Sequence, residues 1–112
     1  MTKPITWCGD SRQRVRDFPA AARSETGHQL NRVQFGHMPE DWKVMQTVGA
    51  GVCEVRIHAD GEFRVLYVAK FVEAIYVLHT FQKKTRKTSK RDLELATERY
   101  RAVMIERRSL KR

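Results

Sequence analysis

The sequence is poor in the residues that build disulfide-bonded, metal-binding or membrane-spanning proteins. Its only two cysteines, Cys8 and Cys53, stand far apart, without the CxxC spacing or nearby histidine cluster typical of zinc sites. No apolar run approaches the ~20 residues of a transmembrane helix, and the first residues lack the apolar core of a signal peptide. We therefore expect a cytoplasmic protein with no disulfide, no metal or other cofactor, and no membrane partner.

Acidic residues are also scarce, and the imbalance lies at one end of the chain. The sequence has 22 Lys and Arg against 13 Asp and Glu, a net charge of +9. Residues 1–82 hold ten basic and nine acidic side chains, whereas residues 83–112 hold twelve and four. A surface of this kind gains affinity for nucleic acid because contacts with phosphates release counterions. A solvated helix face, or a docking surface for an acidic protein, would carry the same charge, so both alternatives stay open.

The length and the composition predict one domain spanning residues 1–112. Hydrophobic residues make up 41% of the chain and charged residues 31%, proportions that are ordinary for a folded protein. A chain of this size can bury one modest core between two packed layers. Residues 1–112 are therefore expected to fold as a unit.

Apolar residues at helical spacing predict helices at both ends of the chain. A short helix begins at Ser11, and a second runs over residues 19–35 until Gly36 ends it. A final helix begins near Ser89, because Ser89 and Asp92 have the spacing of a capping box. The N-terminal pair is expected to form a helical hairpin.

Between these helices the periodicity becomes strand-like. The predicted strands are Lys43–Val48, Val52–His58, Phe63–Lys70 and Ala74–Phe81. The dipeptide Asp60-Gly61 is a strong signal for a hairpin between the second and third of them. The predicted fold class is therefore α+β, with a twisted antiparallel sheet of about four strands between the helical hairpin and the C-terminal helix.

Residues 76–90 join an apolar strand, one histidine and a cationic run. The β-branched and aromatic residues of the strand need a buried sheet, which would fix the strand end while the next side chains project outward. These basic residues are Lys83, Lys84, Arg86, Lys87 and Lys90. Such a cationic lip suits a polyphosphate ligand.

Short motifs along almost the whole chain resemble the phage-derived HigB-type toxins of the RelE/ParE superfamily. They are Trp7-x-Gly9, Phe18-Pro19, Gly36-x-x-Pro39-x-x-Trp42-Lys43, Gly49-x-Gly51-Val52-x-Glu54-Val55-Arg56, Arg64-Val65-Leu66-Tyr67 and His79-x-Phe81-x-Lys83-Lys84-Thr85. The predicted order of helices and strands is also that of the RelE-like fold.

The resemblance implies the toxin of a bacterial type II toxin–antitoxin system. Its expected activity is that of a ribosome-dependent mRNA endoribonuclease that inhibits translation without a metal. Its expected partners are messenger RNA, the ribosome and a cognate antitoxin with a helix-turn-helix domain. Fold alone does not fix this chemistry. The alternatives are a growth inhibitor of the same fold that poisons DNA gyrase, as ParE-type members do, and a non-catalytic nucleic-acid-binding module.

Cleavage of RNA through the ribose 2′-hydroxyl needs a base, an acid and cations that stabilise the pentacoordinate phosphorus. His79, Arg64 and Arg56 are the predicted catalytic residues. The predicted RNA-binding residues are Lys83, Lys84, Arg86, Lys87, Lys43 and Tyr67. RelE-type toxins also carry a tyrosine just after the basic loop, which residues 85–93 lack.

Each of these candidates also has a purely structural interpretation. His79 could be a core histidine with both ring nitrogens bonded, and Tyr67 could be a packed aromatic. Arg56 or Arg64 could form an ion pair with Glu54 inside the sheet. The remaining histidines, His28, His37 and His58, are expected on the surface.

Overall fold

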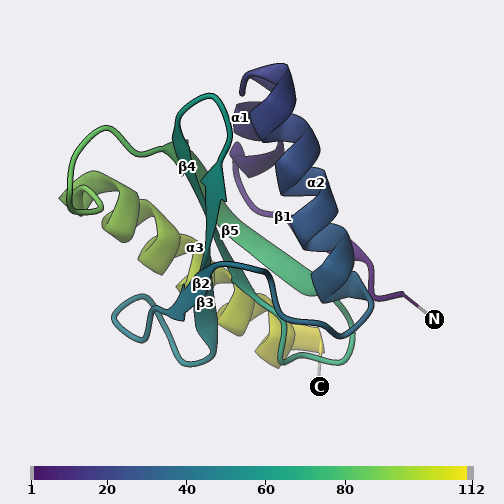
Figure 1. Cartoon of the computed structure of the whole chain (residues 1–112). Coiled ribbons are helices and arrows are strands. Elements are labelled where there is room, and N and C mark those ends of the chain that lie inside the picture. Colours follow the sequence, from purple (N-terminus) through teal and green to yellow (C-terminus); the bar gives the residue numbers. More distant parts are fainter. Residues whose placement is uncertain (1, 111–112) are drawn as a thin grey trace.

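A computed structural model describes residues 2–110, in which a five-stranded mixed sheet carries helices on both faces (Figure 1). Along the chain the elements are β1 (Ile5–Trp7), α1 (Ser11–Arg16), α2 (Ala20–Gln34), β2 (Trp42–Val44), β3 (Val52–His58), β4 (Glu62–Val68), β5 (Ile75–Gln82) and α3 (Lys90–Leu110). Across the sheet the strand order is β1-β5-β4-β3-β2. Helices α1 and α2 cover one face, here called the α2-side face, and α3 packs on the opposite α3-side face (Figure 1).

The α+β class and the C-terminal helix are confirmed, but the predicted antiparallel sheet of about four strands needs correction. Strand β1 adds a fifth strand that runs parallel to β5, with Ile5 opposite Ile75. Three residues are too few to show a strand period, so no pattern in the sequence marked β1. Strand β2 ends at Val44 rather than Val48, because the chain turns there and buries Met45 and Val48 in the α3-side core.

The Asp-Gly dipeptide does form the hairpin between β3 and β4. Asp60 and Gly61 adopt positive φ angles of 53° and 130°, and His58 pairs with Glu62 across the turn. Successive side chains on a strand point to opposite faces, so this register sorts the residues of both strands. Apolar residues of β3 and β4 such as Val55 and Phe63 join the α2-side core, which leaves the charged residues on the α3-side face.

Two apolar cores hold the sheet between its helices. On the α2-side face, the rings of Phe18 and Phe63 lie with centroids 4.4 Å apart. On the α3-side face, Leu66 and Leu78 pack with Ala96 of α3. Helix α3 lies mainly against β5, so the hairpin end of β3 and β4 is left for the loop that precedes α3.

Truncation of Phe63 tests the α2-side core. The side chain is 1% exposed, so Phe63→Ala leaves a cavity and should lower the free energy of unfolding by about 3–5 kcal/mol. Val72→Ala is the control, because Val72 is 89% exposed and its truncation should change stability by less than about 0.5 kcal/mol. Urea denaturation measures both, and similar midpoints for the two variants would contradict the packing.

Candidate active site

Six charged side chains form a closed ring on the α3-side face, at the hairpin end of β3 and β4. They alternate with the apolar residues of the α2-side core, so strand geometry alone brings most of them to one face. The members of this ionic ring are Asp41, Glu54, Arg56, His58, Glu62 and Arg64.

The outer half of the ionic ring is centred on His58. Its Nε2 lies 2.6 Å from Asp41 Oδ2, and its Nδ1 lies 2.8 Å from Glu62 Oε2. Glu62 Oε1 in turn accepts a hydrogen bond of 3.1 Å from Arg64 Nη1. About half of the His58 side chain is exposed, so this half of the ionic ring is open to solvent.

The inner half of the ionic ring is buried around Glu54, which is 1% exposed. Glu54 Oε1 lies 3.8 Å from the Nε atoms of both Arg56 and Arg64, too far for a hydrogen bond. Among residues 2–110, these two Nε atoms are the buried side-chain nitrogens that have no hydrogen-bond partner. Buried N–H groups without partners are costly, so charge balance with Glu54 has to offset the hydrogen bonds that these two atoms lack.

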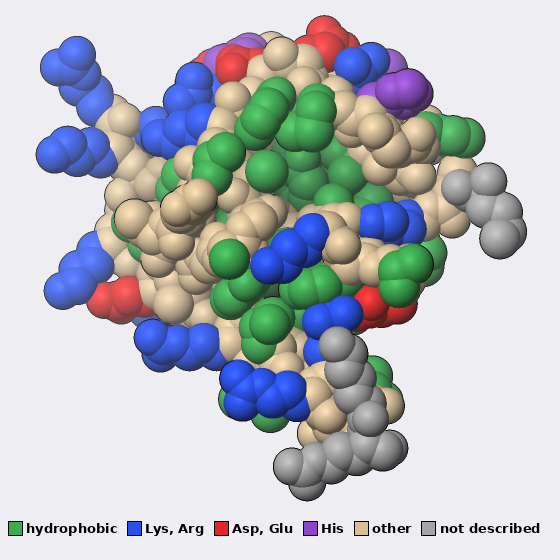
Figure 2. Space-filling view, turned by 90° about the horizontal axis from the view of Figure 1, so that it is seen from below, with side chains coloured by type: hydrophobic (Ala, Val, Ile, Leu, Met, Phe, Trp, Pro, Cys, Tyr) green, Lys and Arg blue, Asp and Glu red, His purple; other side chains and the backbone are tan. Residues whose placement is uncertain are grey.

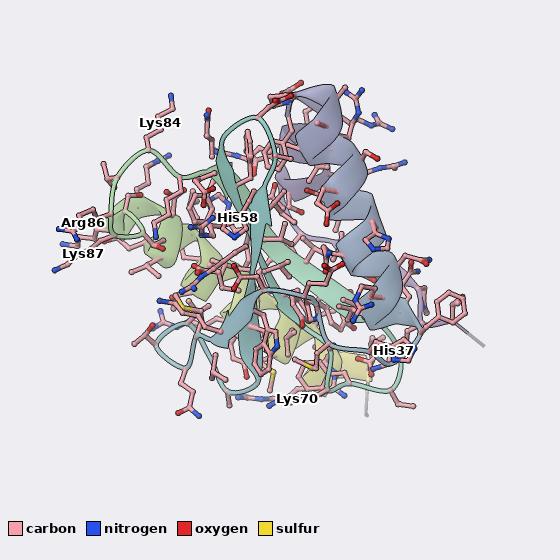
Figure 3. The ribbon with its side chains drawn as sticks, viewed as in Figure 1. His37, His58, Lys70, Lys84, Arg86 and Lys87 are labelled. Atoms are coloured by element: carbon pink, nitrogen blue, oxygen red, sulfur yellow. The ribbon has the colours of Figure 1, made fainter. Side chains whose placement is uncertain are left out.

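Residues 83–89, here called the basic loop, run past the ionic ring to the start of α3. Lys84, Arg86 and Lys87 project from it away from the body of the protein (Figure 3). The loop begins where Lys83 N donates to Glu62 O at 2.7 Å. A groove of about 500 Å³ separates it from the ionic ring, lined by Glu62, Arg64, Lys83, Lys84, Thr85 and Arg86.

The charge around this groove is mainly positive. Seen from below, Lys and Arg side chains gather along the left side of the molecule, the side on which the basic loop lies in Figure 1 (Figure 2). Guanidinium and ammonium groups facing one groove suit a phosphate backbone. The groove therefore has the charge expected of a nucleic-acid site.

His58 is held as an imidazolium by its neighbours. Both ring nitrogens face carboxylate oxygens, which can only accept, so both nitrogens must carry a proton to donate. The hydrogen bonds to Asp41, and then to Glu62, raise the pKa of His58. Protonation also balances the ionic ring, since three carboxylates then face two guanidinium groups and one imidazolium.

His79, a predicted catalytic residue, does not line the groove beside the basic loop. Its side chain is 0% exposed, because β5 carries it beneath the first turns of α3. Its Nε2 lies 2.7 Å from Asp92 Oδ1 and its Nδ1 lies 3.0 Å from Arg99 Nη1. Burial lowers the pKa of His79, although Asp92 opposes the shift. The structure therefore matches the core interpretation of this histidine, with both ring nitrogens bonded.

The other predicted site residues divide between the two faces. Arg56 and Arg64 belong to the ionic ring, and Lys43 lies opposite Glu54 on the edge strand β2. Tyr67, by contrast, is 2% exposed within the α2-side core, and burial raises its pKa. The structure does not bring Tyr67 together with the ionic ring.

Sequence reasoning missed His58 and Glu62 as site residues, although a signal for them was present. Charged residues alternate with apolar ones through positions 54–58 and 62–65, and the hairpin signal pairs position 58 with position 62. Together these would have placed His58 beside Arg56 and Arg64. Asp41 precedes β2 and gave no such signal.

The fold and the site define a small α+β protein with a cationic groove beside a ring of six charged side chains. Residues 13–101 match the family described as phage-derived protein Gp49-like (DUF891), and the chain belongs to this toxin-like family. None of the curated proteins compared with the chain matches it. Within residues 2–110 no helix is both long and apolar enough to span a membrane, and no cluster of three or more His, Cys, Asp or Glu residues is arranged to hold a metal ion.

We expect the pKa of His58 to be higher than the pKa of His79. The pKa of His58 is raised, so its contribution to stability is complete below the unfolded value of about 6.5 and is lost as the pH rises through the raised pKa. The pKa of His79 is lowered, so its contribution is complete above about 6.5 and is lost as the pH falls. NMR titration of the imidazole protons measures both, with His58→Gln and His79→Gln assigning the signals. A higher pKa for His79 than for His58 would contradict the hydrogen-bond assignment.

Proposed function

We propose that this chain is a HigB-type toxin of the RelE/ParE superfamily, which arrests growth by cutting messenger RNA on the ribosome. The observation that carries the proposal is the imidazolium of His58, which is held between Asp41 and Glu62, while Glu62 also pairs with Arg64 and lines the cationic groove. Membership of a toxin-like family and the order of helices and strands support it.

The ionic ring supplies a base and an acid for cleavage at the ribose 2′-hydroxyl. Glu62 lines the groove and accepts the 2′ proton while the 2′ oxygen attacks the adjacent phosphorus, although the hydrogen bond from His58, and that from Arg64, lower its pKa and make it a weak base. The bond from phosphorus to the 5′ oxygen breaks, and the leaving oxygen takes the place of Asp41 and receives the Nε2 proton of His58. The products are a 2′,3′-cyclic phosphate and a 5′-hydroxyl, and one proton has passed from the RNA to Glu62 while His58 has lost one.

The arginines and lysines have different tasks in this reaction. Arg64 is 6% exposed and held by β4, so its guanidinium is in place before negative charge develops on the phosphorus. The basic loop is exposed, and its lysines act as point charges that hold flanking phosphates. The arginines therefore serve the chemical step, and the loop serves binding.

We also propose a neutralising partner, an antitoxin that covers the basic loop or the groove beside it. A toxin-like family implies such a partner, and the charge excess of residues 83–112 favours an acidic surface. Complementary charge would make the association fast and sensitive to salt, while buried anchors would set the affinity.

Controlled expression in a bacterial host, followed by primer extension on an abundant transcript, tests the proposed activity. The wild-type protein should arrest growth and leave discrete cuts in translated messages. His58→Gln should reduce cleavage on the order of 10²–10⁴-fold, because the glutamine cannot protonate the leaving oxygen. His37→Gln is the matched control, since His37 lies at the far end of the molecule (Figure 3) and should stay toxic. Growth arrest with intact transcripts and broken DNA would instead identify a gyrase poison.

Two variants separate chemistry from binding. Arg64→Lys keeps the charge but loses the planar fork, so it should slow cleavage of bound RNA and leave RNA affinity within about threefold. The double variant Lys83→Ala, Lys84→Ala should weaken binding and reduce the salt dependence of the association constant by about 0.7 in log–log slope for each phosphate that the protein no longer binds. An unchanged salt slope in the double variant would rule out the phosphate role of these lysines.

A further inference from the structure

His79 joins the interior of the sheet to the basic loop through hydrogen bonds. We propose that His79 is a positioning residue, which acts through Asp92 to hold the basic loop in place beside the ionic ring. This inference rests on the proposed function for its purpose, since the loop would bind RNA there, but its geometry is independent of any activity.

Arg99 fixes the proton on His79. A guanidinium can only donate, so His79 Nδ1 accepts from Arg99 Nη1 at 3.0 Å and the imidazole proton must sit on Nε2. Arg99 is itself held, because Nη1 also donates to Leu78 O at 3.1 Å and Nη2 donates to Asp10 Oδ1 at 2.7 Å. The Nε2 proton of His79 therefore always faces Asp92.

Asp92 links His79 to the C-terminal end of the basic loop. Its Oδ1 accepts from His79 at 2.7 Å, and its Oδ2 accepts from Ser89 Oγ at 2.6 Å. The Asp92 backbone N–H donates to the same Ser89 hydroxyl at 3.1 Å. Ser89 is the last residue of the basic loop, so three residues connect the buried strand β5 to the loop. Among the hydrogen bonds of residues 2–110, that with His79 ties the cap formed by Ser89 and Asp92 to the sheet.

The loop would move if the hydrogen bond from His79 to Asp92 were broken. Its first residue is held by the backbone bond from Lys83 to Glu62, and Thr88 Oγ1 reaches Glu54 only at 3.4 Å. The cationic side chains within this short segment repel one another. They are Lys83, Lys84, Arg86 and Lys87. Without the bond from His79, only a long contact of Thr88 with Glu54 remains among the hydrogen bonds of the described residues that join this end of the loop to the sheet, and the repulsion favours an open loop.

Other contacts hold the remainder of α3 and provide a control. Tyr100 Oη donates to Ala50 O at 3.0 Å, and the guanidinium of Arg107 pairs with Glu73 and lies 3.7 Å from the ring centroid of Phe71. Removal of one of these would weaken α3 without touching its first turn. A role of His79 in loop position can therefore be separated from a general role in stability.

Limited trypsin digestion of the full-length protein tests the proposal directly, because the loop is rich in trypsin sites. His79→Leu and Asp92→Ala should be cut within residues 83–91 at least about tenfold faster than wild type, the factor expected from loss of one charge-assisted hydrogen bond. Tyr100→Phe should be cut in the loop at the wild-type rate. Asp92→Ala matters because Asp92 is partly exposed, so that variant should fold even if His79→Leu does not.

His79→Gln provides the rescue, since its amide can donate to Asp92 and accept from Arg99. Its loop should be protected almost as in wild type. Equal protection of all the variants, or loss of protection in Tyr100→Phe as large as in Asp92→Ala, would overturn the positioning role.

RNA cleavage then separates this inference from the proposed function. Asp92→Ala and His79→Leu should raise KM about tenfold or more and leave kcat within about threefold, because they displace a binding element and not the ionic ring. A collapse of kcat with the loop still protected would give His79 a direct chemical role and overturn the inference. A protein that cuts no RNA would refute the proposed function, while the trypsin result would still decide the positioning role.

Discussion

The buried carboxylate of Glu54 is the constraint around which the charged end of the molecule is arranged. A carboxylate that is 1% exposed must be matched by nearby positive charge, and Arg56 and Arg64 supply it from β3 and β4. Neither guanidinium closes to hydrogen-bond distance, so the cluster is balanced in charge but incomplete in hydrogen bonds. Thr88 of the basic loop completes the enclosure. Opposite charges therefore make this cluster tolerable in the interior, although its two enclosed Nε donors remain without hydrogen bonds.

The two histidines show how partner type decides protonation. His58 faces two acceptors and is held as an imidazolium, while His79 faces one acceptor, Asp92, and one obligate donor, Arg99. Exposure adds to the contrast, because the interior penalises a charged imidazole and solvent does not. A charged, accessible imidazolium can give up its proton in a reaction. A neutral, enclosed imidazole is suited to holding its neighbours in place.

Much of the fold could be predicted because it depends on local periodicity, and the site was only partly predictable because it depends on distant partners. Helices, the hairpin and the two sheet arginines follow from patterns within about ten residues. Strand β1 is three residues long, and its partner β5 lies some seventy positions away, so no local pattern marks it. From the sequence, His79 is a residue at the end of a strand. In the structure, Asp92 and Arg99 of α3 enclose it. From the sequence, His58 is a surface histidine with no partner. The structure adds the hydrogen bond with Asp41, which closes the ionic ring.

Charge balance explains why the proposed site needs a separate basic loop. With His58 protonated, the ionic ring has no net charge, so it exerts little long-range attraction on RNA however well it is preorganised. The excess charge of the chain lies instead in residues 83–112, which include the basic loop. In the proposed reaction the ionic ring therefore depends on the basic loop, because the ring would perform the chemistry and the loop would attract the RNA. Loss of the His58 proton at high pH would leave the ionic ring with a net negative charge, and in the proposed reaction this one event would both remove the general acid and repel the phosphate.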